Sequence, residues 1–195
     1  MTRIGCVVLA AGFSNRLGEE KALLETGDGA LVGWITKRLS NQGIHPVVVT
    51  RGDILDEVEE AVKPCNVFVN PSPEKGRTGS IKIGISALDE ISEDGYRLIV
   101  VPVDRPGFSD STISKLTGSM ISCCPSRGGR GGHPILLSEG DVEIVRNAPK
   151  ESSLRSLVES KKFEVGDPFL NLNVDTQKDM EDFKSLMDLY SNTSY

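Results

Sequence analysis

The amino-acid sequence predicts an α/β protein built as a three-layer α/β/α sandwich, with a mostly parallel sheet between two layers of helices. Short runs rich in Val and Ile alternate along the chain with stretches in which apolar residues recur at helical spacing, and this alternation is typical of β-α-β units. A chain of 195 residues also suits one core of this kind, and the sequence shows no internal repeat or interdomain linker. We therefore expect a single domain over residues 1–195, with residues 191–195 as a disordered tail.

Each element follows from its local pattern. The apolar, β-branched runs predict strands at residues 4–9, 47–50, 67–69, 97–101, 120–123 and 133–137. The helical spacing of apolar residues predicts helices at residues 31–39, 54–62, 78–91, 109–118 and 180–190. Asp53 is the expected N-cap of the second helix, and Pro64 should end it. Residues 125–132, Pro-Ser-Arg-Gly-Gly-Arg-Gly-Gly, are so rich in glycine that they predict a mobile loop carrying two arginines.

Composition narrows the classes of partner. The net charge is −6, which disfavours unspecific binding to nucleic acid or to anionic lipid. No apolar run approaches the roughly 20 residues that cross a bilayer, and the first apolar run is read as a core strand rather than a signal peptide. The four cysteines show no C-x-x-C spacing, so free thiols are favoured over a zinc site or a disulfide framework. We expect a cytoplasmic protein without nucleic-acid or membrane partners.

The segment after the first strand is the first candidate site. Ligands of open α/β sheets bind beyond the carboxyl ends of the strands. Gly12 and Gly18 allow backbone N–H groups to approach phosphate oxygens, and Arg16 and Lys21 add positive charge suited to a triphosphate. The segment is neither a G-x-x-x-x-G-K-[ST] loop nor a G-x-G-x-x-G loop. The remaining alternative is a surface loop with incidental Gly, Arg and Lys.

A carboxylate follows a second buried strand. Asp104 comes directly after the apolar run at residues 98–103, at the edge where this kind of sheet holds its chemistry. Mg²⁺ prefers few carboxylates together with phosphate oxygens, so Asp104 is the first candidate metal ligand. The alternative is a turn aspartate ahead of Pro106.

Residues 9–21 resemble the L-A-[AG]-G-x-S-x-R-[ML]-G-x-x-K signature of the molybdopterin nucleotidyltransferase family, and every fixed position is met. The resemblance implies the nucleotide-diphospho-sugar transferase fold, with its Rossmann-like sheet. It also implies that Arg16 and Lys21 act on the phosphates and, with Asp104, in catalysis. The nucleotide-binding residues implied in this segment are Leu9, Ala10, Ala11, Gly12, Ser14, Arg16 and Lys21.

Later segments resemble the same family in the same order, including D-x-P at residues 104–106. Residues 70–80 match N-x-x-x-x-x-G-x-x-x-S and imply nucleotide contacts from Gly76 and Ser80. Residues 173–179 are similar to the closing D-x-[DN]-T-P-x-D segment, with Gln177 where proline is usual.

These likenesses extend to the metal and the acceptor. They imply Asp175 as a further metal ligand, with Asn173 as the alternative; a helix cap is the structural alternative for Asp175. In the acceptor region, His133 and Arg155 are the residues implied to contact the acceptor, although a structural role for His133 is the competing interpretation.

The activity implied by the resemblance is Mg²⁺-dependent transfer of a nucleoside monophosphate from CTP or GTP to a molybdopterin-type phosphate, with release of pyrophosphate, as in molybdenum cofactor biosynthesis. Ala11 and residues 131–134 favour the cytidylyl branch, whereas residues 153–158 and 169–173 favour the guanylyl branch. Arg105 stands inside D-x-P where a neutral residue is usual, and the G-D-x-G-x-R acceptor motif is replaced by residues 147–152. There are two alternatives. The acceptor is another small phosphorylated compound, such as a sugar phosphate or phospholactate, or the protein is a non-catalytic nucleotide-binding regulator. A monomer or small homo-oligomer is expected.

Overall fold

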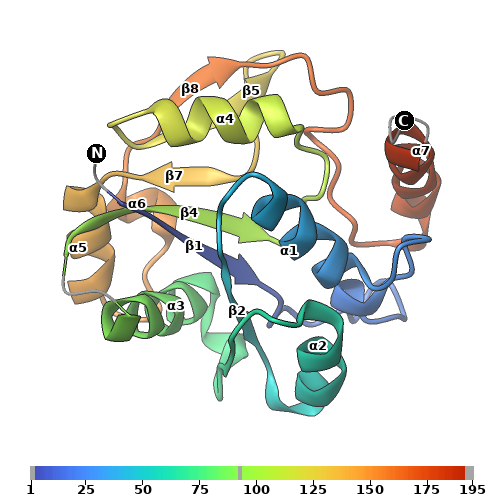
Figure 1. Cartoon of the computed structure of the whole chain (residues 1–195), viewed down its shortest axis with the longest axis horizontal. Helices are drawn as coiled ribbons and strands as arrows, with labels where there is room; N and C mark the ends of the chain where they lie inside the picture. The colour runs from blue at the N-terminus through green and yellow to red at the C-terminus, as the bar shows by residue number, and fades with distance from the viewer. Residues whose placement is uncertain (1–2, 92–93, 192–195) are drawn as a thin grey trace.

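The computed structural model describes residues 3–91 and 94–191. Its eight strands form one sheet (Figure 1). Seven of them follow the order β3-β2-β1-β4-β7-β5-β6, and β8 pairs with β5 outside this order. The strands are β1 Arg3–Leu9, β2 Val47–Thr50, β3 Val67–Val69, β4 Tyr96–Pro102, β5 Cys123–Arg127, β6 Arg130–Gly131, β7 Ile135–Leu137 and β8 Lys161–Glu164. The helices are α1 Leu31–Asn41, α2 Leu55–Val62, α3 Arg77–Ile91, α4 Asp110–Gly118, α5 Glu139–Asn147, α6 Leu154–Leu157 and α7 Met180–Ser191.

The first part of the sheet is parallel. β1 lies between β2 and β4 and runs parallel to both, and β3 adds a further parallel strand beside β2. Beyond β4 the direction alternates, because β7 pairs antiparallel with β4 and with β5, while β8 runs parallel to β5. The carboxyl ends of the four parallel strands therefore share one edge, the edge at which ligands bind in open α/β sheets.

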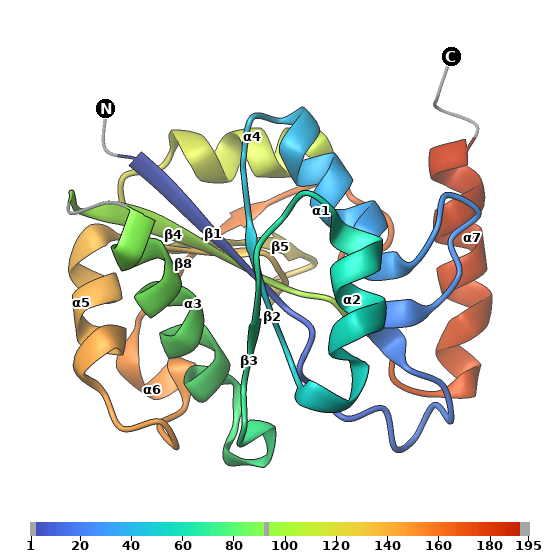
Figure 2. The same cartoon turned by 60° about the horizontal axis from the view of Figure 1, so that its bottom comes forward.

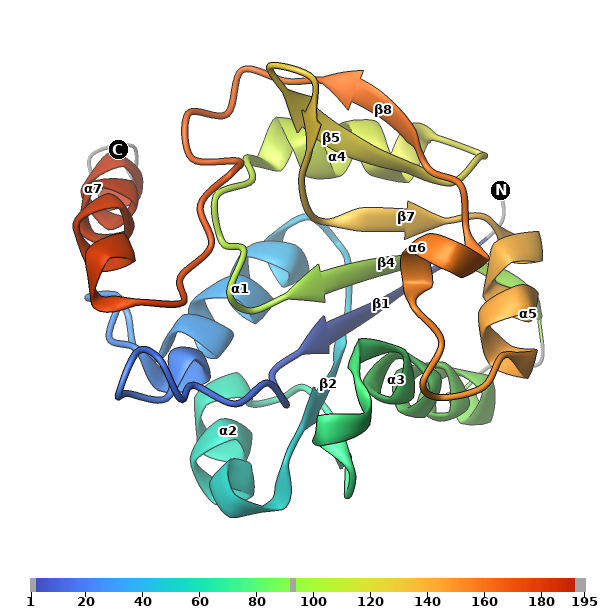
Figure 3. The ribbon, with the colours of Figure 1, turned by 180° about the vertical axis from the view of Figure 1, so that it is seen from behind.

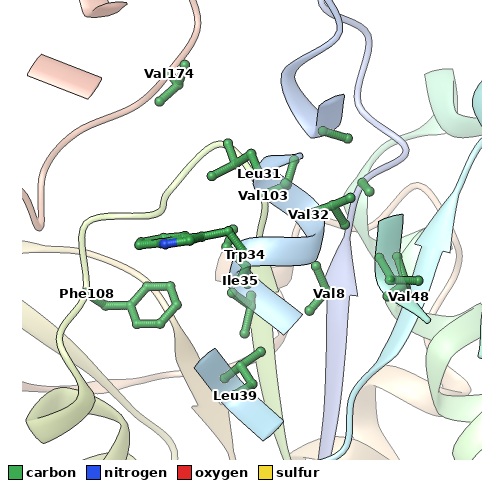
Figure 4. Packing of buried hydrophobic residues seen from close by; sticks show 14 of the residues in the cluster. Val8, Leu31, Val32, Trp34, Ile35, Leu39, Val48, Val103, Phe108 and Val174 are labelled. Atoms are coloured by element: carbon green, nitrogen blue, oxygen red, sulfur yellow. The ribbon is translucent and has the colours of Figure 1, made fainter. Parts of the chain in front are cut away.

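Helices cover both faces of this sheet. Successive side chains of β1 alternate, so Cys6 and Val8 pack into one apolar cluster and Val7 and Leu9 into another. The first cluster contains buried residues of α1, α2, α4 and α7, and the second those of α3 and α5, with α6 packed at its margin. Figure 2 shows the two helical layers, and Figure 4 shows α1 packed over β1 through residues such as Ile35. The predicted α/β/α sandwich is confirmed.

The contact between α3 and β1 is unusually close. A Cβ added at Gly84 would lie 2.4 Å from Cγ2 of Val7, well inside van der Waals contact. Gly84 therefore lets α3 lie directly on the central strand, which positions the N-terminal end of α3 at the ligand-binding edge. None of the described helices is long and apolar enough to span a bilayer.

Most predicted helices and the first four strands are present within one or two residues of their expected bounds. Asp53 is the exception at a helix start. Residues 52–54 form a 3₁₀ turn, the cap position of α2 is Ile54 without a side-chain cap, and the Asp53 carboxylate pairs with Arg51 instead. The side chain two residues earlier has thus taken the carboxylate that the sequence pattern assigns to the cap.

The glycine-rich segment is not a loop. Residues 125–127 belong to β5 and residues 130–131 to β6, joined through Gly128 and Gly129 with φ of 57° and 77°. Two glycines with positive φ make the tight connection of a β-hairpin, so the glycines that suggested irregular backbone form its turn. The strand predicted at residues 120–123 begins only at Cys123, and Met120 and Ile121 are exposed before it.

Besides β6, three further elements lie where no helix or strand was predicted. α5 begins at the Ser138 cap, whose hydroxyl accepts from the Asp141 N–H, and it buries Val142 and Val145. α6 is a single turn, and β8 is an edge strand with the charged sequence Lys-Lys-Phe-Glu, which lacks the apolar pattern of a strand. At the carboxyl end, Ser191 of the predicted tail still belongs to α7, and residues 192–195 lie outside the described residues.

Candidate active site

An open cavity lies at the carboxyl ends of β1 and β4, the edge at which the strand order and the sequence both predict a ligand site. The loop after β1, the start of α3, the segment after β4 and the segment before α7 all contribute to its wall. In Figures 1 and 3 the loop after β1 runs beside the segment that leads into α7. The predicted site residues that line the cavity are Leu9, Ala10, Ala11, Gly12, Arg16, Lys21, Gly76, Ser80, Asp104, Asn173 and Asp175.

An ion-pair network joins two ends of the chain in this cavity. The Lys21 ammonium donates to Oδ1 of Asp175 at 2.5 Å, and Arg16 pairs with Oδ2 of the same carboxylate. The side chains of Lys21 and Asp175 are about one-tenth exposed, whereas Arg16 is largely in solvent. The two cations predicted to bind a triphosphate are thus held by one anion that a phosphate group would have to replace or share.

The loop after β1 is closed on itself by Ser14. The Ser14 hydroxyl accepts from the Lys21 N–H at 3.0 Å and donates to Glu20, and its carbonyl accepts from the N–H groups of Leu17 and Gly18. Gly18 has φ of 83°, a left-handed conformation that glycine adopts without a steric penalty. Ser14 is buried and does not line the cavity. In this structure its hydrogen bonds fix the position of Lys21.

Arg51 holds the same loop in place, and the sequence did not predict this role. It follows β2, is almost fully buried, donates to the Gly12 carbonyl at 2.8 Å and pairs with Glu20 and Asp53. Its guanidinium also lies 5.3 Å from the ring centroid of Phe13. An arginine directly after a parallel strand was the one local signal that could have indicated this role.

Asp104 lines the cavity directly after the end of β4. Its carboxylate lies 3.6 Å from the Arg77 guanidinium, and its carbonyl accepts from the Val174 N–H at 2.9 Å. That backbone bond ties the segment before α7 to the end of β4. It places Asn173 and Asp175 next to Asp104 although about 70 residues separate them in sequence.

The oxygen donors of this wall suit a hard divalent cation. Mg²⁺ is bound through one or two carboxylates with phosphate oxygens and water. Asp104 supplies a carboxylate, and the buried Oδ1 of Asn173 has no hydrogen-bond partner among the described residues. Both oxygens of Asp175 are engaged by cations, so Asn173 is the freer neighbour of Asp104 in this state. No cluster of three or more His, Cys, Asp or Glu occurs in the described parts of the chain.

The start of α3 forms the third side of the site. Gly76 has φ of 109° and ends a 3₁₀ turn directly before the helix. The Ser80 hydroxyl accepts from the buried Asn70 side chain at 2.9 Å, which fixes the first turn of α3 against the end of β3. Asn70, the first residue of the 70–80 motif, therefore acts by positioning Ser80.

The two predicted acceptor residues do not line the cavity. Arg155 is exposed on α6. His133 is mostly buried, its Nδ1 has no partner among the described residues, and burial together with Arg77 and Arg105 lowers its pKa to about 3. Burial also lowers the pKa of Arg105, against the opposing effect of Asp104. The roles given to His133 and Arg155 stay predictions.

Comparison with known proteins places this site in a family context. A "Probable molybdenum cofactor guanylyltransferase" of Bacillus mycoides (strain KBAB4) is 32% identical over 116 residues, which is 60% of this chain and 56% of that protein. The chain thus spans little more than half the length of this relative. The "Molybdenum cofactor cytidylyltransferase" of Escherichia coli (strain K12) is 23% identical over 189 residues, or 92% and 94% of the two chains.

Solved structures agree on the fold. Rv0371c from Mycobacterium tuberculosis H37Rv superposes with a TM-score of 0.75 at 24% identity, covering 96% of this chain and 98% of that one. Its complex with manganese gives a TM-score of 0.71 at 20% identity, covering 94% and 99%. A family profile, the MobA-like NTP transferase domain, matches residues 6–165, which contain the loop after β1, the start of α3 and Asp104. The chain belongs to the MobA-like NTP transferase domain family.

Proposed function

We propose that this protein is a nucleotidyltransferase that transfers a nucleoside monophosphate from a nucleoside triphosphate to a phosphorylated acceptor of the molybdopterin type. In this reaction an acceptor phosphate oxygen forms a bond to the α-phosphorus, the bond from the α-phosphorus to the bridging oxygen breaks, and pyrophosphate leaves. Phosphoryl chemistry of this kind depends on positioning and charge neutralisation more than on a covalent nucleophile.

The single observation that carries the proposal is the arrangement around Asp175. Arg16 and Lys21 from the loop after β1 meet a carboxylate of the segment before α7, and Asp104 at the end of β4 lines the same cavity. A site meant only to bind a triphosphate needs the cations but no carboxylates beside them. Cations and carboxylates together favour a site that holds both phosphates and a metal ion.

The chain's own groups have distinct roles under this proposal. Lys21 and Arg16 bind phosphate oxygens and neutralise the charge that builds on the leaving pyrophosphate. The backbone of Ala10, Ala11 and Gly12 and the first turn of α3 at Gly76 and Ser80 hold the remainder of the nucleotide. Asp104, with Asn173 or Asp175, would hold the divalent cation, which supplies charge neutralisation and a template for the phosphates.

The base is proposed to be cytosine, with guanine as the alternative. Ala11 in the loop after β1 favours the cytidylyl branch, and the cytidylyltransferase relative aligns along nearly the whole chain. The guanylyltransferase relative is more identical but over a shorter stretch, so both nucleotides belong in the test.

Thermal unfolding with Mg²⁺ and each of CTP, GTP, ATP and UTP tests the nucleotide half of the proposal. A ligand that binds only the folded state at 100 times its Kd stabilises it by about 2.7 kcal/mol, so the preferred base should raise Tm selectively. If none of the four raises Tm, the proposal fails. Pyrophosphate release with a molybdopterin-type acceptor, a sugar phosphate or phospholactate then identifies the acceptor class. Selective binding with no release from any of them would indicate a nucleotide-binding regulator.

A further inference from the structure

Three arginines from distant parts of the sequence lie near one another, and two of them, Arg77 and Arg105, line the cavity. Arg77 begins α3, Arg105 follows β4, and Arg130 lies in β6. The charges of Arg77 and Arg130 both act on the Arg105 guanidinium, and those of Arg77 and Arg105 act on the nearby His133. We refer to Arg77, Arg105 and Arg130 as the arginine cluster.

The cluster carries more positive charge than its surroundings neutralise. Two carboxylates act on Arg105, those of Asp104 and Asp175. Asp104 is 3.6 Å from Arg77, while Asp175 is already paired with Lys21 and Arg16. Within the described residues Arg130 has no ion-pair partner, and buried His133 stays neutral near physiological pH. Although the net charge of the protein is −6, three guanidinium groups lie together with only about one carboxylate to neutralise them. The three positive charges repel one another, so a bound anion would stabilise this arrangement.

The donors of Arg105 are also incompletely used. Its Nε is buried with no hydrogen-bond partner among the described residues, and its NH1 reaches only the Asn171 carbonyl at 3.5 Å. A buried donor without a partner costs free energy, because it has lost its hydrogen bonds to water. Guanidinium groups present planar pairs of donors that match the oxygens of a phosphate, so an oxyanion is the ligand that satisfies them.

The position of the cluster separates it from the nucleotide loop. The loop follows β1, whereas Arg105 follows β4 and Arg130 lies in β6, and β7 and β5 extend the sheet on the far side of β4 from β1 (Figure 3). Arg77 and Arg105 line the cavity with Asp104, so their guanidinium groups face the same space as Arg16 and Lys21. The signature loop accounts for the nucleotide's phosphates through Arg16 and Lys21, which leaves the cluster for a second phosphate.

We propose that the arginine cluster binds the phosphate monoester of the acceptor and thereby sets the acceptor class to dianionic phosphates. This inference rests on the proposed nucleotidyl transfer. By holding that phosphate, the cluster orients the acceptor towards the α-phosphorus.

The test uses the full-length protein and inorganic phosphate as the probe, titrated by calorimetry in the presence of Mg²⁺. One series is done without nucleotide and one with the protein saturated by non-hydrolysable α,β-methylene CTP or GTP, whichever raises Tm. The variants are Arg105→Gln and Arg130→Gln. Arg127→Gln is the matched control, because Arg127 lies opposite Arg130 in the β5–β6 hairpin but its guanidinium donates to the Asp167 carbonyl at 2.7 Å.

Both cluster variants should weaken phosphate binding by about tenfold or more, as expected for the loss of a charge-assisted hydrogen bond. Their affinity for the nucleotide analogue should change by less than about twofold, and Arg127→Gln should match the unmodified protein. In phosphate-free buffer the cluster variants should unfold at a Tm no lower than that of the unmodified protein, because a repulsive charge is removed. A retained Tm shows that weaker binding does not come from misfolding.

Two results would overturn the inference. Phosphate binding that is unchanged in both variants would show that the cluster is not an anion site. Phosphate binding that disappears from the unmodified protein once the nucleotide analogue is bound would assign the cluster to the nucleotide's own phosphates. Failure of the proposed function is recognised separately, because in that case no nucleoside triphosphate would bind while the phosphate series could still be measured.

Discussion

Lys21 and Asp175 are 154 residues apart in the sequence, and in the folded protein the Lys21 ammonium donates to Oδ1 of Asp175 at 2.5 Å. This contact joins the nucleotide loop after β1 to the segment before α7. Asp175 therefore has two roles to reconcile. It neutralises a largely buried ammonium in the free protein, and it stands where a triphosphate would compete for the same cation.

Removing the Asp175 carboxylate should destabilise the fold. Asp175→Ala leaves the Lys21 ammonium about one-tenth exposed without its anion. We expect the free energy of unfolding to fall by about 2 kcal/mol, less than the ~3–5 kcal/mol of a fully enclosed pair, because cavity water can solvate Lys21. Urea unfolding measures the change. The double variant with Lys21→Met should recover most of the loss, and a double variant no more stable than Asp175→Ala would contradict the ion pair as the cause.

Asp104→Asn should abolish turnover without unfolding the protein. The amide keeps the shape of the carboxylate but loses the charge proposed to hold a divalent cation. We expect the rate of pyrophosphate release to fall at least about 100-fold, the effect typical of removing one electrostatic contact to the transition state. Asp56→Asn, an exposed carboxylate on α2, serves as the control and should retain full activity. Activity of Asp104→Asn near that of the unmodified protein would remove Asp104 from the site.

Arg51 should govern nucleotide affinity through the shape of the loop rather than by contact with the ligand. Its contacts with the Gly12 carbonyl, Glu20 and Asp53 hold the loop before any ligand arrives. Arg51→Ala should raise the Kd for the nucleoside triphosphate about tenfold. The loop would then become ordered only when the ligand binds, and the cost of ordering it would reduce the free energy of binding. Calorimetry measures the Kd, and amide hydrogen exchange in residues 12–20 should become faster. Slower or unchanged exchange together with weaker binding would point to a direct contact instead.

His133 should make the fold sensitive to acid. Its pKa is lowered to about 3 in the folded protein by burial and by Arg77 and Arg105, against about 6.5 in an unfolded chain. A lowered folded-state pKa means that the unfolded chain binds the proton first. The contribution to stability is therefore complete above pH 6.5 and is lost as the pH falls towards 3.

Between pH 7 and pH 4.5 we expect the unmodified protein to lose about 2–3 kcal/mol more stability than His133→Gln, measured by urea unfolding at each pH. His45→Gln removes the chain's other histidine, which is exposed, and should behave as the unmodified protein does. Parallel losses in the unmodified protein and His133→Gln would show that His133 is not the group responsible.

Local patterns in the sequence predicted the layers of the fold well, and the errors have physical causes. Helical periodicity identified α1, α2, α3, α4 and α7 because each buries one apolar face against the sheet. β8 was missed because an edge strand with two lysines owes its place to backbone pairing with β5 and not to its own side chains. The glycines of residues 128–129 were read as irregular because positive φ fits a hairpin turn as well as a loop.

The sequence by itself determined the class of sheet, the place of the loop that is proposed to bind the nucleotide and the two cations in it, because these depend on residues that are close neighbours in the chain. Only the tertiary structure decided what those cations meet. Asp175 pairs with both cations, Arg51 holds the loop that carries them, and Arg77 and Arg105 line the same cavity. No periodicity in the sequence encodes these contacts. The order of the strands brings these residues together. Because β1 lies beside β4, the Val103 N–H donates to the Leu9 carbonyl at 3.0 Å, and the loop after β1 therefore lies next to the segment after β4.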